Sequence, residues 1–220
     1  MAIRKVPFVK REYYHIFNRG NDKRGIFMDK YDAFRFLQSM EEFNNIENGN
    51  DIFYRNRLNK NVGGPTAHKD KDKLVNIVCY CLNPNHYHFI LEQLVDGGIS
   101  EFMKRLNGGY TWYFNNKYDR SGSLFQGKFK SVHIESNEQL LYDSCYVNLN
   151  NKVHRKFDNL KDNFLDEISN RSSWDEYTNK NSKFNICKKD IILGQYKDIE
   201  DYKKIAEGTA RAINEKRYGD

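Results

Sequence analysis

Two histidines separated by one residue lie in the apolar run HYHFIL, residues 86–91. Residues two apart on a β-strand point to the same face of the sheet, so His86 and His88 project together. The aromatic and aliphatic residues between and after them take the opposite face. Two imidazoles on one face suit a metal site. Histidines that simply pack in a core are the alternative.

A tyrosine and an asparagine four residues apart follow later in the chain. Ser136 and Gln139 have the spacing of a capping box, which predicts a helix over residues 137–153. Positions four apart lie on one helix face, so Tyr146 and Asn150 line up. If this helix packs across the histidine face, Asn150 offers an amide oxygen as a third ligand beside the phenol. In the alternative, Tyr146 is a core aromatic and Asn150 caps the helix.

A hydroxyl next to a metal ion suits phosphoryl transfer. Tyrosine has an unperturbed pKa of about 10 and needs help to attack at neutral pH. A divalent ion gives that help by drawing charge from the phosphate and orienting it in line. Two imidazoles would also suit zinc, but an amide oxygen and open positions favour Mg²⁺ or Mn²⁺. We therefore expect one of these ions as cofactor.

The positive charge of the chain is concentrated in its first part. The formal net charge is +6, and residues 1–157 carry 24 Lys and Arg against 17 Asp and Glu. Residues 158–220 carry 12 against 13. The excess suggests a polyanionic partner, with a solvated surface as the alternative.

The hydrophobic patterns predict the element order β, α, β, β, α, β, α, followed by a polar C-terminal part. This is the split βαβ order of an α+β, ferredoxin-like (RRM-like) antiparallel sheet, with helices on one face and an additional catalytic helix. We expect a catalytic domain at residues 1–157 and a small helical appendage at 158–220, with an exposed loop at 58–72. Strands are predicted at about 12–20, 74–82, 86–93 and 128–134, and helices at about 30–43, 99–119, 137–153, 187–195 and 198–214.

The four cysteines lie mostly in apolar stretches, and none forms a C-x-x-C pair. Buried free thiols in a reducing compartment are expected. The N-terminus has no apolar segment of signal-peptide length, and no apolar run reaches 18 residues. A cytoplasmic protein that does not contact membranes is therefore expected.

Four segments resemble one family. NPNHYHFIL at residues 83–91 resembles the M-P-N-H-x-H segment of the single-tyrosine HUH transposases, and specifically of the REP-associated tyrosine transposase branch. YYHIFNRGN at 13–21 is similar to that branch's Y-H-V-x-x-R-G-N pattern, and RSGSLFQGKFK at 120–130 is similar to its R-S-G-x-L-W-Q-G-R-F-K pattern. YVNLN at 146–150 is similar to its Y-I-H-L-N-P pattern. A fifth segment, SSWDEY at 172–177, resembles its W-S-S-Y region.

The resemblance implies that His86 and His88 bind the metal, that Asn150 completes the ligand set and that Tyr146 attacks DNA. The implied reaction cleaves one strand at a hairpin in single-stranded DNA, leaves a 5′-phosphotyrosine and a free 3′-OH, and rejoins the strand to another 3′-OH without ATP. Monomer and homodimer are both compatible with it. Asn148 stands where many members have His, and Asn151 replaces a Pro, so the catalytic helix is expected to run longer here.

The resemblance gives the basic and aromatic residues an expected role in DNA binding. Basic side chains would contact phosphates, and aromatic side chains that are exposed would stack on unpaired bases. For Asn18 and Arg19, turn formation is the alternative to hairpin contact. The candidates for DNA contact are Asn18, Arg19, Lys104, Arg105, Tyr110, Trp112, Tyr113, Arg120, Phe125, Gln126, Lys128 and Lys130.

Two other functions stay open from the sequence. A catalytically silent nucleic-acid-binding module would explain the charge and the aromatic residues but not the histidine pair with Tyr146. A metal-dependent phosphodiesterase that uses water would need the metal site, with Tyr146 acting only in packing.

Overall fold

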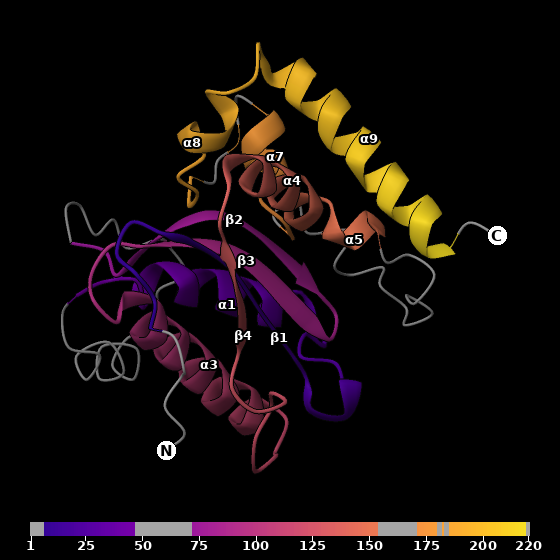
Figure 1. The fold of residues 1–220 in the computed structure, drawn as a ribbon. Coiled ribbons are helices and arrows are strands. Elements are labelled where there is room, and N and C mark those ends of the chain that lie inside the picture. Colours follow the sequence, from indigo (N-terminus) through magenta and orange to yellow (C-terminus); the bar gives the residue numbers. More distant parts are fainter. Residues whose placement is uncertain (1–6, 47–71, 154–170, 180–181, 183–184, 219–220) are drawn as a thin grey trace.

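A four-stranded antiparallel sheet forms the centre of the protein (Figure 1). The structure is a computed structural model that describes residues 7–46, 72–153, 171–179, 182 and 185–218. The strands lie in the order β2-β3-β1-β4, which confirms the predicted ferredoxin-like sheet. The strands are β1 (Tyr13–Arg19), β2 (Val75–Asn83), β3 (His86–Gln93) and β4 (Lys130–Ile134).

One face of the sheet is covered by α1 (Lys30–Glu42) and α3 (Gly98–Lys117), and a 3-10 turn, η1 (Asn21–Lys23), follows β1. The aromatic residues that alternate with the histidines on β3 enter this layer, as predicted. The ring of Phe36 lies 5.4 Å from that of Tyr87 and 4.9 Å from that of Tyr110, and all three side chains are fully buried. This apolar layer packs against the sheet face opposite to the one that carries the histidines.

The opposite face carries a second helical layer (Figure 1). α4 (Asn137–Asn148) packs against β2, β3 and β4, and α9 (Ile199–Tyr218) packs against α4. The expectation of helices on one face of the sheet and a further helix outside that layer therefore holds. The C-terminal helices pack around that further helix, α4. The shorter helices on this side are α5 (Asn150–Val153), α7 (Trp174–Thr178) and α8 (Asp190–Leu193).

The C-terminal part also covers the edge of β2. The backbone N–H of Leu82 donates to the carbonyl of Arg171, and that of Ser173 donates to the carbonyl of Tyr80. The hydroxyl of Tyr177 donates to the carbonyl of Val78 at 2.8 Å. Backbone groups on the open edge of β2 thereby gain hydrogen-bond partners. The same bonds hold residues 171–177, which include the SSWDEY segment, against the sheet. The predicted boundary at residue 157 and the loop up to residue 71 lie outside the described residues.

The helix that carries the tyrosine begins as predicted but ends earlier. Ser136 Oγ accepts from the backbone N–H of Gln139 at 3.2 Å, which confirms the N-cap, whereas Gln139 Oε1 accepts from the N–H of Glu135. α4 ends at Asn148, and Leu149, at φ −109°, separates it from the short α5. The expectation of one longer helix is wrong, because this break bends the chain so that α5 also packs against β2.

All four cysteines are buried free thiols, as expected. Among the described helices, none has the length and apolar character needed to cross a membrane.

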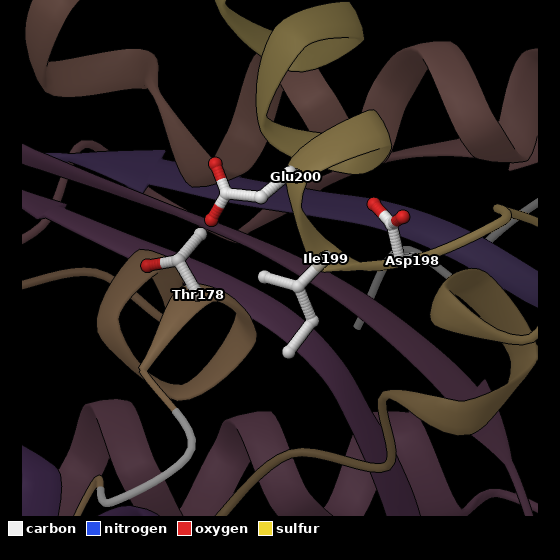
Figure 2. A pocket seen from close by; sticks show the side chains of 4 residues that line it. All are labelled: Thr178, Asp198, Ile199 and Glu200. Atoms are coloured by element: carbon white, nitrogen blue, oxygen red, sulfur yellow. The ribbon is translucent and has the colours of Figure 1, made fainter.

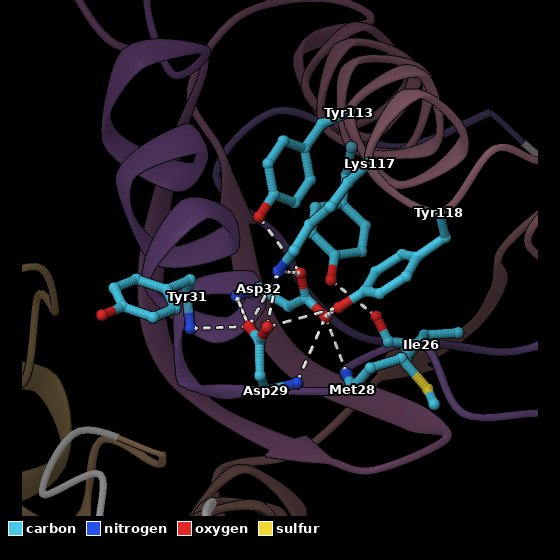
Figure 3. A network of polar contacts seen from close by, with 9 residues as sticks. Ile26, Met28, Asp29, Tyr31, Asp32, Tyr113, Lys117 and Tyr118 are labelled. Carbon is cyan, nitrogen blue, oxygen red and sulfur yellow. Dashed lines mark hydrogen bonds and ion pairs between the residues drawn. The ribbon is translucent and has the colours of Figure 1, made fainter. Parts of the chain in front are cut away.

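A buried carboxylate ties α1 to the end of α3 (Figure 3). Asp32 is fully buried, and its two oxygens accept from Lys117 at 2.7 Å, from Tyr113 at 3.1 Å and from Tyr118 at 2.8 Å. The backbone N–H of Met28 donates to the same carboxylate at 2.7 Å. Every partner is a donor, so the hydrogen-bonding capacity of this buried carboxylate is used by groups from α3, from its C-cap residue and from the segment before α1.

Lys117→Met is expected to lower the free energy of unfolding by about 2–3 kcal/mol, since a buried carboxylate then loses its cationic partner. Lys104→Met on the same helix is the matched control, because Lys104 is exposed and its pair with Glu101 is 3.4 Å long. Its expected cost is below about 1 kcal/mol. Urea unfolding curves measure both, and equal losses would contradict the role given to the buried pair.

Candidate active site

The histidine pair lies on the face of the sheet that α4 covers. His86 and His88 have ring centroids 5.2 Å apart, and His86 is half-buried while His88 is 8% exposed. In the register of the sheet, His86 stands opposite Arg19 on β1, and His88 stands opposite Phe17. Directly paired residues of an antiparallel sheet point to the same face, so Arg19 and Phe17 share the histidine face.

Tyr146 reaches the histidines from α4. Its ring centroid lies 5.8 Å from that of His88, nearly perpendicular to it, and the side chain is partly buried. The structure therefore brings the predicted nucleophile and the predicted ligand pair together. This arrangement follows from α4 packing across β2 and β3 through its buried face, which includes Cys145 and Val147.

A third histidine, which was not predicted as a site residue, orients His88. The Nε2 atom of His15 lies 2.8 Å from Nδ1 of His88, and its ring lies 6.0 Å from that of Tyr146. Burial lowers the pKa of His15 to about 4, so the ring is neutral at pH 7. A hydrogen bond to one nitrogen of a histidine fixes the direction of the other. The period-two pattern of β1, in which His15 and Phe17 share a face, was the available sequence signal.

The proton of His86 is placed by its neighbours. Asn85 Nδ2 donates to the carbonyl of Lys23, which leaves Asn85 Oδ1 turned toward His86 Nδ1 at 2.7 Å. An amide oxygen only accepts, so Nδ1 carries the proton. In the neutral ring Nε2 then holds a lone pair, and it lies 3.1 Å from Nδ2 of Asn83.

Asn150 is fully buried beside the histidines. Its Oδ1 accepts from Nδ2 of Asn83 at 2.9 Å, whereas its Nδ2 has no hydrogen-bond partner among the described residues. Leaving a buried amide donor unsatisfied is costly, and such atoms concentrate at functional sites. The break at Leu149 means that Asn150 begins α5 instead of continuing the Tyr146 helix, but its oxygen still faces the sheet.

The donor set fits a divalent cation. No three His, Cys, Asp or Glu side chains of the described residues cluster as a metal site, so a cation here would need the amide oxygen. The lone pairs of His86 Nε2 and Asn150 Oδ1 point at the same nitrogen of Asn83, which means that two neutral acceptors converge on one position. A small cation requires such convergence, and this mixed N and O set suits Mg²⁺ or Mn²⁺.

The last turn of α9 places the positively charged side chain of Arg217 beside the ring of Tyr146. The guanidinium carbon of Arg217 lies 5.7 Å from the centre of the Tyr146 ring, within the range of a cation–π contact. The side chain of Asn148 helps to hold α9 in place, because its Nδ2 donates to the hydroxyl of Tyr202 at 2.7 Å. Arg217 was not predicted, because only the packing of α9 on α4 brings it near the site.

Some predicted DNA-contact residues share the histidine face or border it. Arg19 is exposed opposite His86, and exposed Lys130 stands opposite Phe17 on the other side of β1. Gln126 accepts a hydrogen bond from the Arg19 guanidinium, and exposed Lys128 lies in the segment that leads into β4. Arg19 and Lys130 therefore place positive charge on β1 and β4, opposite His86 and Phe17.

Several other candidates lie where they cannot contact DNA at this site. Tyr110 and Phe125 are buried among core aromatic residues, so the prediction that they stack on bases is not supported. Arg105 is buried and donates to Glu101 and to the carbonyl of Asn45, which explains its charge without a phosphate. Asn18 points toward the core and donates to the carbonyl of Gly127.

The remaining candidates belong to α3 or its C-terminal end. Exposed Lys104 and Trp112 and partly buried Tyr113 lie on the helix that covers the opposite sheet face. The guanidinium of Arg120 lies 5.6 Å from the centre of the Phe114 ring. None of these four side chains belongs to the face that carries the histidines.

A hollow of about 440 Å³ lies away from this site. It is lined by Thr178 at the end of α7 and by Asp198, Ile199 and Glu200 at the start of α9 (Figure 2). Two carboxylates give it an acidic character, which does not suit a polyanionic strand. It contains none of the residues predicted to do chemistry.

Comparison with known proteins connects the geometry to a family. The family described as "Transposase IS200 like" matches residues 46–150. A solved structure described as a REP-associated tyrosine transposase bound to a REP hairpin is 12% identical, with a TM-score of 0.39, covering 70% of this chain and 74% of that one. No curated protein matches the chain.

The family match spans the catalytic candidates. Residues 46–150 include both histidines of β3, the tyrosine of α4 and the first residue of α5, and they exclude β1 and the C-terminal helices. The histidine and tyrosine segments that carry the sequence resemblance, and the side chains that the fold brings together, both lie within residues 46–150. Residues 46–150 of this chain are therefore similar to the family described as "Transposase IS200 like".

Proposed function

We propose that this chain is a metal-dependent DNA transposase of the single-tyrosine HUH type, in the REP-associated tyrosine transposase branch. It cleaves and rejoins single-stranded DNA at hairpin-containing sites through a covalent link to Tyr146. The observation that carries the proposal is the placement of the Tyr146 ring 5.8 Å from His88, on the face that also holds His86. A silent binding module has no need of this constellation.

In the proposed reaction, the phenol oxygen of Tyr146 attacks a backbone phosphorus and forms a 5′-phosphotyrosine bond. The bond from phosphorus to the 3′ oxygen breaks, and the departing strand takes up a proton as a free 3′-OH. A second 3′-OH then attacks the same phosphorus, and the phenol is released. One phosphodiester is exchanged for another through an ester of similar energy, so no ATP is needed.

The chain's own residues have separate roles in this scheme. His86, His88 and Asn150 would hold Mg²⁺ or Mn²⁺, which supplies charge neutralisation at the scissile phosphate. His15 keeps His88 in a fixed orientation through its 2.8 Å contact. Arg217 places a positive charge over the ring of Tyr146, where negative charge develops when the phenol loses its proton.

The proposal is tested with a hairpin-bearing single-stranded oligonucleotide incubated with the protein and Mg²⁺ or Mn²⁺. The expected product is a protein–DNA adduct that survives a denaturing gel, together with a free 3′-OH fragment. Cleavage without an adduct would favour a water-using phosphodiesterase. Binding without cleavage in either metal would favour a silent nucleic-acid-binding module.

Lys130→Ala is expected to weaken binding of single-stranded DNA uniformly across sequences. The slope of log affinity against log salt should fall by about 1, because one phosphate contact is lost. Lys104→Ala is the matched control: this lysine is also exposed but lies on α3, over the opposite sheet face. Fluorescence anisotropy at several salt concentrations measures both, and equal effects would contradict a DNA path along the histidine face.

A further inference from the structure

The side-chain amide of Asn83 lies between two of the proposed metal ligands. Asn83 ends β2 and pairs with His86 in the sheet register, so both side chains point to the face that carries the site. The side chain is 2% exposed. Its Nδ2 lies 2.9 Å from Asn150 Oδ1 and 3.1 Å from His86 Nε2. A single NH₂ group therefore donates to both acceptors.

Arg171 determines which end of this amide faces the ligands. The guanidinium is 5% exposed; it donates from Nη2 to Asn83 Oδ1 at 3.4 Å and from Nε to the carbonyl of Leu82 at 3.2 Å. Arginine has only donors. Rotating the Asn83 amide by 180° would place its NH₂ group against the Arg171 guanidinium, donor against donor. It would also place its oxygen against Asn150 Oδ1 and His86 Nε2, acceptor against acceptor. The NH₂ group consequently stays turned toward His86 and Asn150.

The two atoms that Asn83 contacts are the ones through which these residues would bind a cation. His86 Nδ1 carries the proton that is donated to Asn85, which leaves only Nε2 with a lone pair. The amide nitrogen of Asn150 has no lone pair to offer a metal, so only its oxygen can act as a ligand. An N–H donor and a cation therefore compete for the same two lone pairs.

We propose that Asn83 is a positioning residue whose side-chain NH₂ group competes with the divalent cation for His86 Nε2 and Asn150 Oδ1. This competition raises the dissociation constant of the cation. The inference rests on the proposed function of this site. Asn83 keeps the two lone pairs convergent, and cation binding replaces its two hydrogen bonds by two metal–ligand bonds.

The test is Asn83→Leu, which keeps a side chain of similar length but removes both donors. Mn²⁺ affinity is measured by electron paramagnetic resonance of the free ion, with the whole protein and without DNA. The dissociation constant is expected to fall about tenfold, which corresponds to one or two hydrogen bonds of ordinary net strength. Asn76→Leu is the matched control on the same strand, since Asn76 donates to Glu92 and not to the site, and it should leave the affinity unchanged.

Unchanged or weaker Mn²⁺ binding by folded Asn83→Leu, judged by circular dichroism, would overturn the inference. A measurement on the wild-type protein covers the case in which the variant does not fold. In a nuclear magnetic resonance titration with Mg²⁺, the side-chain NH₂ signals of Asn83 should shift together with the imidazole of His86, while those of Asn76 stay in place. A shift of His86 with the Asn83 signals unchanged would contradict the competition.

The two proposals fail in different ways. Wild-type protein that binds neither ion and forms no adduct overturns the proposed function together with this inference. Wild-type protein that binds Mn²⁺ and forms the adduct, beside an Asn83→Leu variant with unchanged affinity, overturns the inference alone.

Discussion

Tyr146→Phe is expected to abolish the covalent adduct and to reduce strand cleavage by about a thousandfold or more, as removal of a nucleophile does in other covalent enzymes. The change deletes one oxygen and keeps the ring against His88 and under Arg217. Binding of the hairpin should weaken by less than about tenfold, since at most one ordinary hydrogen bond is lost. Denaturing gels with labelled DNA measure the adduct, and anisotropy measures the binding.

Tyr142→Phe is the matched control for this prediction. Tyr142 lies on the same helix, one turn before Tyr146, and its side chain is 52% exposed. The same deletion of a hydroxyl there should leave the adduct at the wild-type level. Cleavage that persists in Tyr146→Phe would instead identify water as the nucleophile and reduce Tyr146 to packing.

Replacement of both His86 and His88 by Ala is expected to stop cleavage at any concentration of Mg²⁺ or Mn²⁺. Each replacement removes one imidazole ligand. The amide oxygen of Asn150 that remains cannot hold a cation alone. The fold should survive, with a loss below about 2 kcal/mol, because neither side chain belongs to the apolar layer under α1 and α3. Adduct formation and thermal unfolding are measured on the same preparation.

His133→Ala is the matched control for the double replacement. His133 lies on β4, is exposed and pairs with Glu12 at 3.1 Å. Its replacement should change neither cleavage nor stability by a measurable amount. If the double variant unfolds at physiological temperature, the histidines are core residues and the metal-site interpretation is wrong.

Local patterns predicted the sheet and the position of its histidines. The turn at Pro84–Asn85 fixes the hairpin of β2 and β3, and the alternation of β3 assigns His86 and His88 to one face whatever covers that face. These features depend on residues close in the sequence. The strand order then follows from the few connections that a β, α, β, β, α, β chain permits.

Long-range packing produced what the sequence did not predict. The break at Leu149 starts a new short helix at Asn150, which helix periodicity did not predict. Tyr110 is buried because its ring packs against Phe27 and Phe36. His15 and Arg217 reach the site through the sheet register and through the docking of α9 on α4. Such contacts depend on which surfaces meet, and a pattern along one segment does not specify that.

The central claim is that the phenol of Tyr146 becomes joined to the 5′ phosphate of cleaved DNA next to the paired histidines. The most direct measurement is mass spectrometry of the protein–DNA adduct after proteolysis and nuclease digestion, with Mn²⁺ present during the reaction. The account predicts a nucleotide 5′-phosphate on the peptide that contains Tyr146, at that residue. A nucleotide attached to any other residue, or strand cleavage with no nucleotide on the protein, would contradict it.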